Sequence, residues 1–72
     1  MFSREELGQK IRQERLKAGE SQKVLADLLG VGTTQVSELE NGKTTTSFER
    51  LVLICEHYKV SSDYLLGLKD ER

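Results

Sequence analysis

Apolar residues recur at steps of three and four positions along most of the chain, a spacing that favours helices over strands. No segment alternates strictly between apolar and polar residues, and proline is absent. Glycine, serine and threonine residues divide the pattern into five short stretches, which predicts an all-α fold of five helices. Because 72 residues supply too little apolar surface for a second core, we expect one domain over residues 1–72.

Residues that favour helix ends stand on either side of these stretches. Each stretch follows a residue suited to the N-cap position. These residues are Ser3, Ser21, Gly32, Ser47 and Ser61. The first three stretches end at Gly19, at Gly30 and at Asn41-Gly42, which readily take the left-handed backbone conformation that follows a helix. We therefore expect five capped helices and a sharp turn at Gly30.

The inward positions of the five stretches predict the hydrophobic core. They are Leu7, Ile11, Leu25, Ala26, Leu28, Leu29, Val36, Leu39, Phe48, Leu51, Ile54, Cys55, Tyr58, Val60, Leu65 and Leu68. Cys55 is the only cysteine, so an intramolecular disulfide is excluded, and its inward position favours packing over chemistry. No apolar run is long enough to span a bilayer, and the polar start of the chain differs from a signal peptide, so we expect a cytoplasmic protein that does not bind membranes.

Candidate catalytic and metal-binding groups are sparse. His57 is the single histidine and has no second ligand at metal spacing, which favours a solvated position on the outer face of its helix. Ser21 and Ser37 lack the Gly-x-Ser-x-Gly turn and the histidine and acid partners of a serine nucleophile. The sequence therefore predicts a protein that is not an enzyme and uses no metal or cofactor.

Residues 22–41 form the most informative segment, because two short helices are joined there by only a few residues around Gly30. So short a joint forces the two helices to cross steeply. Ala26 leaves room for the second helix to approach, and Gly30 supplies a turn with a positive φ. This spacing is typical of a helix-turn-helix.

Here the sequence also resembles the lambdoid phage repressor and Cro type of helix-turn-helix domain, known as the XRE family, over nearly the whole chain. The resemblance is carried by Arg15, Gly19, Ser21-Gln22, Leu25-Ala26, Leu29-Gly30-Val31, the stretch VSELENGK at residues 36–43 and the stretch VSSDYLLG at residues 60–67. It implies a compact five-helix, lambda-repressor-like domain that binds double-stranded DNA and regulates transcription. The second helix of residues 22–41 is then expected to enter the major groove.

The resemblance also implies roles for individual residues. Base edges would be read by Thr33, Thr34, Ser37 and Glu38. Phosphates would be bound by Ser21, Gln22, Asn41 and Lys43. Arg15 and Glu40 match positions that form a partly buried ion pair between the first and third helices.

The charge of the chain and three departures from the family pattern qualify this expectation. Eleven basic and twelve acidic residues give a net charge of -1, which is unusual for a nucleic-acid binder, so few counterions would be released and the salt dependence should be shallow. Glu38 stands where the family commonly has Arg, Lys or Gln, and residues 44–46 are neutral threonines where basic residues are common. Glu20 replaces an apolar residue, so we expect looser packing at that corner.

The leading hypothesis is a homodimeric repressor that binds a pseudopalindromic operator, with its two recognition helices about 34 Å apart. Candidates for the dimer interface are Tyr64, Leu65 and Leu68. The apolar cluster of Leu65, Leu66 and Leu68 could either close the core or contact a second subunit, and the sequence leaves both explanations open. The alternative is a protein-interaction module, such as an antitoxin, in which Glu38 has weakened DNA binding and the apolar C-terminal face binds a protein partner.

Overall fold

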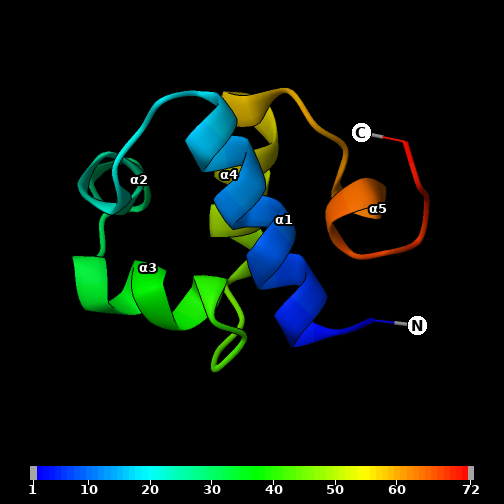
Figure 1. Cartoon of the computed structure of the whole chain (residues 1–72), viewed down its shortest axis with the longest axis horizontal. Coiled ribbons are helices and arrows are strands. Elements are labelled where there is room, and N and C mark those ends of the chain that lie inside the picture. Colours follow the sequence, from blue (N-terminus) through cyan, green and yellow to red (C-terminus); the bar gives the residue numbers. More distant parts are fainter. Residues whose placement is uncertain (1, 72) are drawn as a thin grey trace.

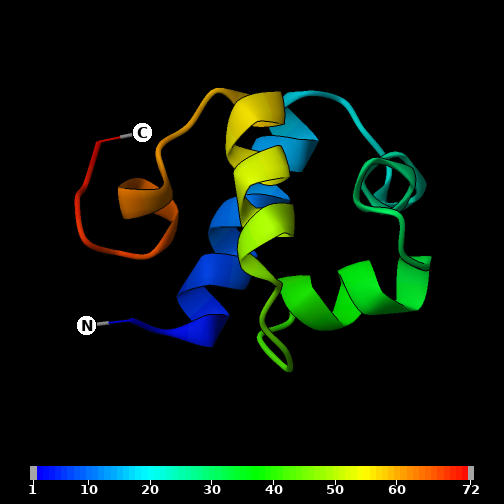
Figure 2. The ribbon, with the colours of Figure 1, turned by 180° about the vertical axis from the view of Figure 1, so that it is seen from behind.

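The computed structural model describes residues 2–71, which form five α-helices and no strand. The helices are α1 (Arg4–Lys17), α2 (Gln22–Leu29), α3 (Thr33–Glu40), α4 (Phe48–Tyr58) and α5 (Ser62–Leu65). The predicted all-α fold of five helices is confirmed. Helices α1 and α4 lie side by side in the centre, with α2 and α3 on one side of them and α5 on the other (Figures 1 and 2).

The helices begin where the capping residues predict, because serine hydroxyls accept the free amides of the first turn. Ser3, Ser21, Ser47 and Ser61 each accept a backbone N–H from the residue three positions on, at 3.1–3.4 Å. Gly32 precedes α3 without a side-chain cap. None of the helices within residues 2–71 has the length and apolar content needed to cross a lipid bilayer.

The core is formed by apolar side chains from all five helices and from the segment before α5. The buried ones are Leu7, Ile11, Leu25, Ala26, Leu29, Val36, Leu39, Ile54, Tyr58, Val60 and Leu65. Cys55 is half-buried against this cluster, where burial raises the pKa of its thiol. Its predicted role in packing therefore agrees with its position.

Two of the residues at predicted inward positions, Phe48 and Leu68, lie outside the core. Phe48 is 75% exposed because it is the first residue of α4, ahead of the turns that pack against α1 and α2. Leu68 lies beyond α5 and is 64% exposed, so of its two explanations closure of the core is wrong.

Candidate functional site

Helices α2 and α3 are joined by a three-residue turn and cross steeply, so that Figure 1 shows α2 nearly end-on and α3 lying across the view. Gly30 has φ 70° and ψ 34°, the positive φ that the sequence predicted. The buried Ala26 and Leu29 of α2 face a core shared with Val36 and Leu39 of α3. The turn and this apolar contact fix the angle between the two helices.

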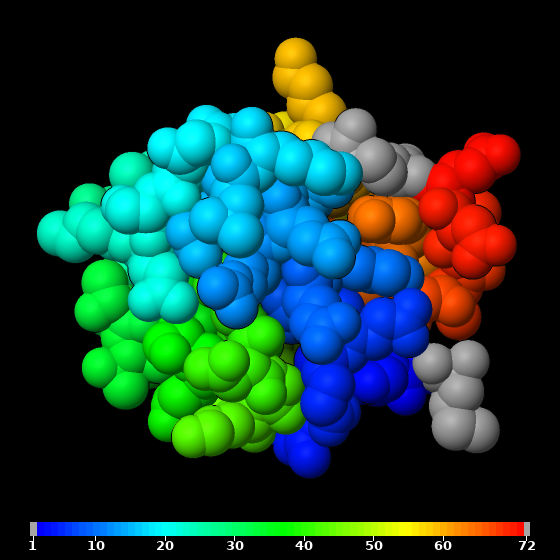
Figure 3. All heavy atoms as spheres, viewed as in Figure 1, coloured from blue at the N-terminus to red at the C-terminus, as the bar shows by residue number. Residues whose placement is uncertain are grey.

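The outer face of α3 carries the four side chains predicted to read bases. Thr33 and Thr34 are exposed, and Ser37 and Glu38 are partly exposed, whereas the inward positions of the same helix are buried. No other segment of residues 2–71 covers this face, and α3 forms part of the molecular surface at the lower left of Figure 3. A polar helical face is therefore available to a ligand.

The four residues predicted to bind phosphate lie around this face, at the start of α2 and after α3. The Ser21 hydroxyl accepts the Val24 amide, so this residue caps α2 while it stays exposed. The Asn41 side-chain amide donates to the Ser37 hydroxyl at 3.3 Å, which joins two of the predicted contact residues. Lys43 is exposed at the end of the turn that follows α3.

A buried ion pair holds α3 to α1. Arg15 donates to both carboxylate oxygens of Glu40, from Nε at 2.7 Å and from Nη2 at 3.1 Å, and the two side chains are 8% and 2% exposed. The hydrogen bonds to Glu40 raise the pKa of Arg15 against the opposing effect of burial. Gln22 also donates to Glu40, at 3.2 Å, so this pair orients one of the predicted phosphate ligands.

Glu20 and His57 form a contact that the sequence analysis missed. His57 Nε2 lies 2.7 Å from one oxygen of Glu20, and the Tyr58 hydroxyl donates to the other at 2.9 Å. His57 is exposed on the outer face of α4, as the sequence predicted, but it also pairs with Glu20, which the sequence did not predict. These residues are 37 positions apart, and only the packing of α4 against the loop before α2 brings them together, so no local signal reveals the contact.

The dimer candidates differ in their accessibility. Leu65 is 1% exposed and closes the core, so its side chain is not available to a second subunit. Tyr64 is partly exposed, with Lys10 Nζ 4.7 Å from the centre of its ring. Of the three, Leu68 presents the most open side chain.

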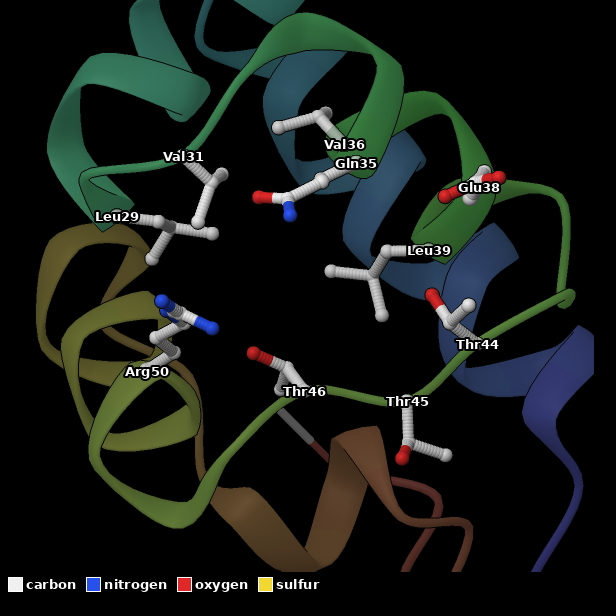
Figure 4. A pocket seen from close by; sticks show the side chains of 10 residues that line it. All are labelled: Leu29, Val31, Gln35, Val36, Glu38, Leu39, Thr44, Thr45, Thr46 and Arg50. Carbon is white, nitrogen blue, oxygen red and sulfur yellow. The ribbon is translucent and has the colours of Figure 1, made fainter.

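A cavity of about 190 Å³ lies beside α3, between this helix, the following loop and the start of α4. Its lining residues are Leu29, Val31, Gln35, Val36, Glu38, Leu39, Thr44, Thr45, Thr46 and Arg50 (Figure 4). Arg50 was not among the residues predicted from the sequence. Within residues 2–71, no three histidine, cysteine or acidic side chains are grouped to hold a metal ion.

A family model described as "Helix-turn-helix" matches residues 11–65, which include the two crossed helices and their turn. This chain belongs to the helix-turn-helix family. The lambdoid repressor and Cro type of domain, to which the sequence analysis pointed, is thereby confirmed.

Relatives of this helix-turn-helix protein include the HTH-type transcriptional regulator ImmR of Bacillus subtilis (strain 168), which is 38% identical over 65 residues. Those residues are 90% of this chain and 50% of ImmR, so the chain spans about half the length of the curated relative it matches.

Solved structures with the same fold include two regulators. The P22 c2 repressor, in complex with synthetic operator 9T, has a TM-score of 0.80 and 30% identity over 88% of this chain and 96% of that one. The clp gene regulator ClgR from C. glutamicum has a TM-score of 0.75 and 33% identity over 89% of this chain and 83% of that one.

Proposed function

We propose that this helix-turn-helix protein binds double-stranded DNA sequence-specifically in the cytoplasm, with α3 in the major groove, and acts as a transcriptional repressor. The observation that carries the proposal is the uncovered polar face of α3, held in place by the core and by the Arg15–Glu40 pair. A helix of this kind fits the major groove, which is about 12 Å wide. The P22 c2 repressor, which has the same fold, is complexed with an operator.

The side chains on this face supply a modest direct readout. The hydroxyls of Thr33, Thr34 and Ser37 donate or accept hydrogen bonds, and the threonine methyl groups pack against the methyl group of thymine. The Glu38 carboxylate accepts only, so it selects the N4 amino group of cytosine and rejects acceptor edges.

Phosphate contacts by Ser21, Gln22, Asn41 and Lys43 would set the register of α3 in the groove. Lys43 is the only charged residue in this set. Binding of the protein to DNA would therefore release few counterions, and its affinity for DNA should depend weakly on salt concentration. Gln22 reaches the duplex pre-oriented, because its amide is already held by Glu40.

We further propose that the protein acts as a homodimer on a pseudopalindromic operator. A second subunit would place its own α3 one helical turn along the same face of the duplex, about 34 Å away. The exposed Leu68 and the adjoining Tyr64 supply an apolar surface for the contact between subunits.

Selection from a random duplex library tests this function, since it reports both the preferred bases and the spacing of half-sites. We expect an enriched inverted repeat, and we expect Thr34→Ala to lower affinity for it by roughly tenfold, equivalent to about 1.4 kcal/mol. Gln13→Ala, on the exposed side of α1, is the matched control and should bind as the parent protein does. Recovery of unenriched sequences would refute sequence-specific binding.

A second candidate function, protein binding in the manner of an antitoxin, is favoured by the exposed Phe48 and Val52 beside an apolar hollow between α4 and the start of α5. In that case Glu38 repels phosphate and DNA binding is lost. If Glu38→Gln also fails to bind any duplex while a co-purifying protein persists, this second candidate replaces the first.

A further inference from the structure

The cavity beside α3 has an apolar floor and a polar rim. Leu29, Val31, Val36 and Leu39 form the floor. In Figure 4 the Gln35 amide, the Thr46 hydroxyl and the Arg50 guanidinium point toward the same space from three different segments. Donors of hydrogen bonds therefore converge at the mouth of a hollow that adjoins the outer face of α3.

The Arg50 guanidinium makes no ion pair with any of residues 2–71, although its backbone amide is bound by the Ser47 hydroxyl. Glu38 lines the same cavity and likewise makes no ion pair within this range, so two opposite charges share a hollow without contact. A cation in the first turns of α4 also opposes the helix dipole. Interactions within the fold thus give no stabilising reason for a guanidinium there.

The position of the cavity relative to α3 suggests what Arg50 binds. Glu40, on the inward side of α3, contacts Gln22, so the start of α2 lies along one edge of the polar face. Gln35 and Glu38 lie along the other edge, against the cavity. A duplex that receives α3 in its major groove brings a phosphate backbone to both edges.

At the edge of the polar face of α3 that adjoins the cavity, the loop of residues 44–46 consists of threonines. Arg50 of α4 therefore supplies the positive charge at this edge. A guanidinium binds two phosphate oxygens at once in a planar geometry, which suits it to this position better than a lysine.

We propose, on the basis of the function proposed above, that Arg50 binds a DNA backbone phosphate at this cavity. Thr46 and Gln35 assist as hydrogen-bond donors. The positive charge of Arg50 also reduces the repulsion between Glu38 and the duplex, so that a carboxylate is tolerated on the recognition helix.

The experiment compares the parent protein with Arg50→Ala on the enriched duplex over a range of salt concentrations. We expect Arg50→Ala to bind about tenfold more weakly, uniformly across sequences, with the slope of log affinity against log salt smaller in magnitude by about 1. Arg50→Lys should recover the salt slope but only part of the affinity. Lys59→Ala, which removes a cation from the opposite end of α4, should leave affinity and slope unchanged.

Two further results decide the proposal. Arg50→Ala should weaken binding less in a Glu38→Gln background than in the parent protein, because the repulsion that Arg50 offsets is then absent. Equal losses in the two backgrounds would show that Arg50 does not offset the charge of Glu38. If the parent protein binds its duplex and Arg50→Ala matches it in affinity and slope, the phosphate contact is refuted while the proposed function stands. If the parent protein enriches no duplex, the proposed function itself fails. Unchanged thermal unfolding of Arg50→Ala checks that the fold is intact.

Discussion

Gly8 of α1 lies so close to α3 that a β-carbon at this position would overlap the carbonyl oxygen of Leu39. The same β-carbon would stand 2.6 Å from the carbonyl oxygen of Glu40. Glycine therefore lets the backbones of α1 and α3 meet, two turns along α1 from the point where Arg15 binds Glu40. This approach sets the position of the polar face of α3.

Gly8→Ala should destabilise the protein by about 3 kcal/mol, because rigid backbone atoms have to move to admit the methyl group. At an exposed helical glycine, the same substitution would instead raise stability, because alanine favours the helix more than glycine does. Urea unfolding monitored by circular dichroism measures the change. Gln9→Ala, at the exposed neighbouring position, should stay within about 0.5 kcal/mol of the parent protein. An unchanged or raised stability of Gly8→Ala would contradict the close contact.

Glu40→Ala should cost about 3 kcal/mol of stability, since it leaves the buried Arg15 guanidinium without its carboxylate and frees the Gln22 amide. Glu38→Ala removes a carboxylate from the same helix and should change stability by no more than about 0.5 kcal/mol. Thermal and urea unfolding of the two variants give the comparison. Equal losses of stability in the two variants would show that the Arg15–Glu40 ion pair does not stabilise the fold.

The Glu20 contact predicts a loss of stability in acid. Burial acts to raise the pKa of Glu20, but hydrogen bonds from His57 and Tyr58 and the nearby positive charges lower it below its ordinary value of 4.5. A lowered folded-state pKa means that the carboxylate stabilises the fold above pH 4.5, and that this contribution is lost as the pH falls through the folded-state pKa.

We therefore expect Glu20→Gln to be less stable than the parent protein at about pH 6, and we expect the difference to shrink as the pH falls toward about 3. Denaturant unfolding across this range measures the difference. Glu71→Gln, at an exposed position near the end of the described chain, is the control and should show no such convergence. A constant difference between Glu20→Gln and the parent protein would refute the assignment.

Lys59 ends α4 in the left-handed conformation, at φ 56° and ψ 47°, where a β-carbon is strained. Lys59→Gly should raise stability by roughly 0.5–1 kcal/mol, because relief of the strain exceeds the entropy that glycine adds to the unfolded chain. Lys59→Ala keeps the β-carbon and should leave stability unchanged. Thermal unfolding distinguishes the two, and equal effects would argue against strain at this cap.

Leu68→Glu should weaken self-association without unfolding the chain, since this side chain is exposed and a carboxylate is costly in an apolar interface. Leu65→Ala should instead cost about 3 kcal/mol of stability because Leu65 fills the core. Sedimentation equilibrium and urea unfolding separate these effects. A monomeric parent protein at every concentration, or unchanged association of Leu68→Glu, would refute a dimer contact at Leu68.

The sequence by itself determined the five helices, their starts at Ser3, Ser21, Ser47 and Ser61, and the left-handed turn at Gly30. Each depends on interactions between residues at most four positions apart, which the order of side chains specifies directly. The separation of α3 into a polar and an apolar face follows from the same local periodicity.

Only the tertiary structure decided the Gly8 contact with Leu39, the pairing of His57 with Glu20, and the place of Arg50 in a cavity beside α3. It also separated the buried Leu65 from the exposed Leu68, which the apolar pattern treats alike. These relationships join residues from different helices, so they depend on crossing angles and packing distances that no local pattern contains.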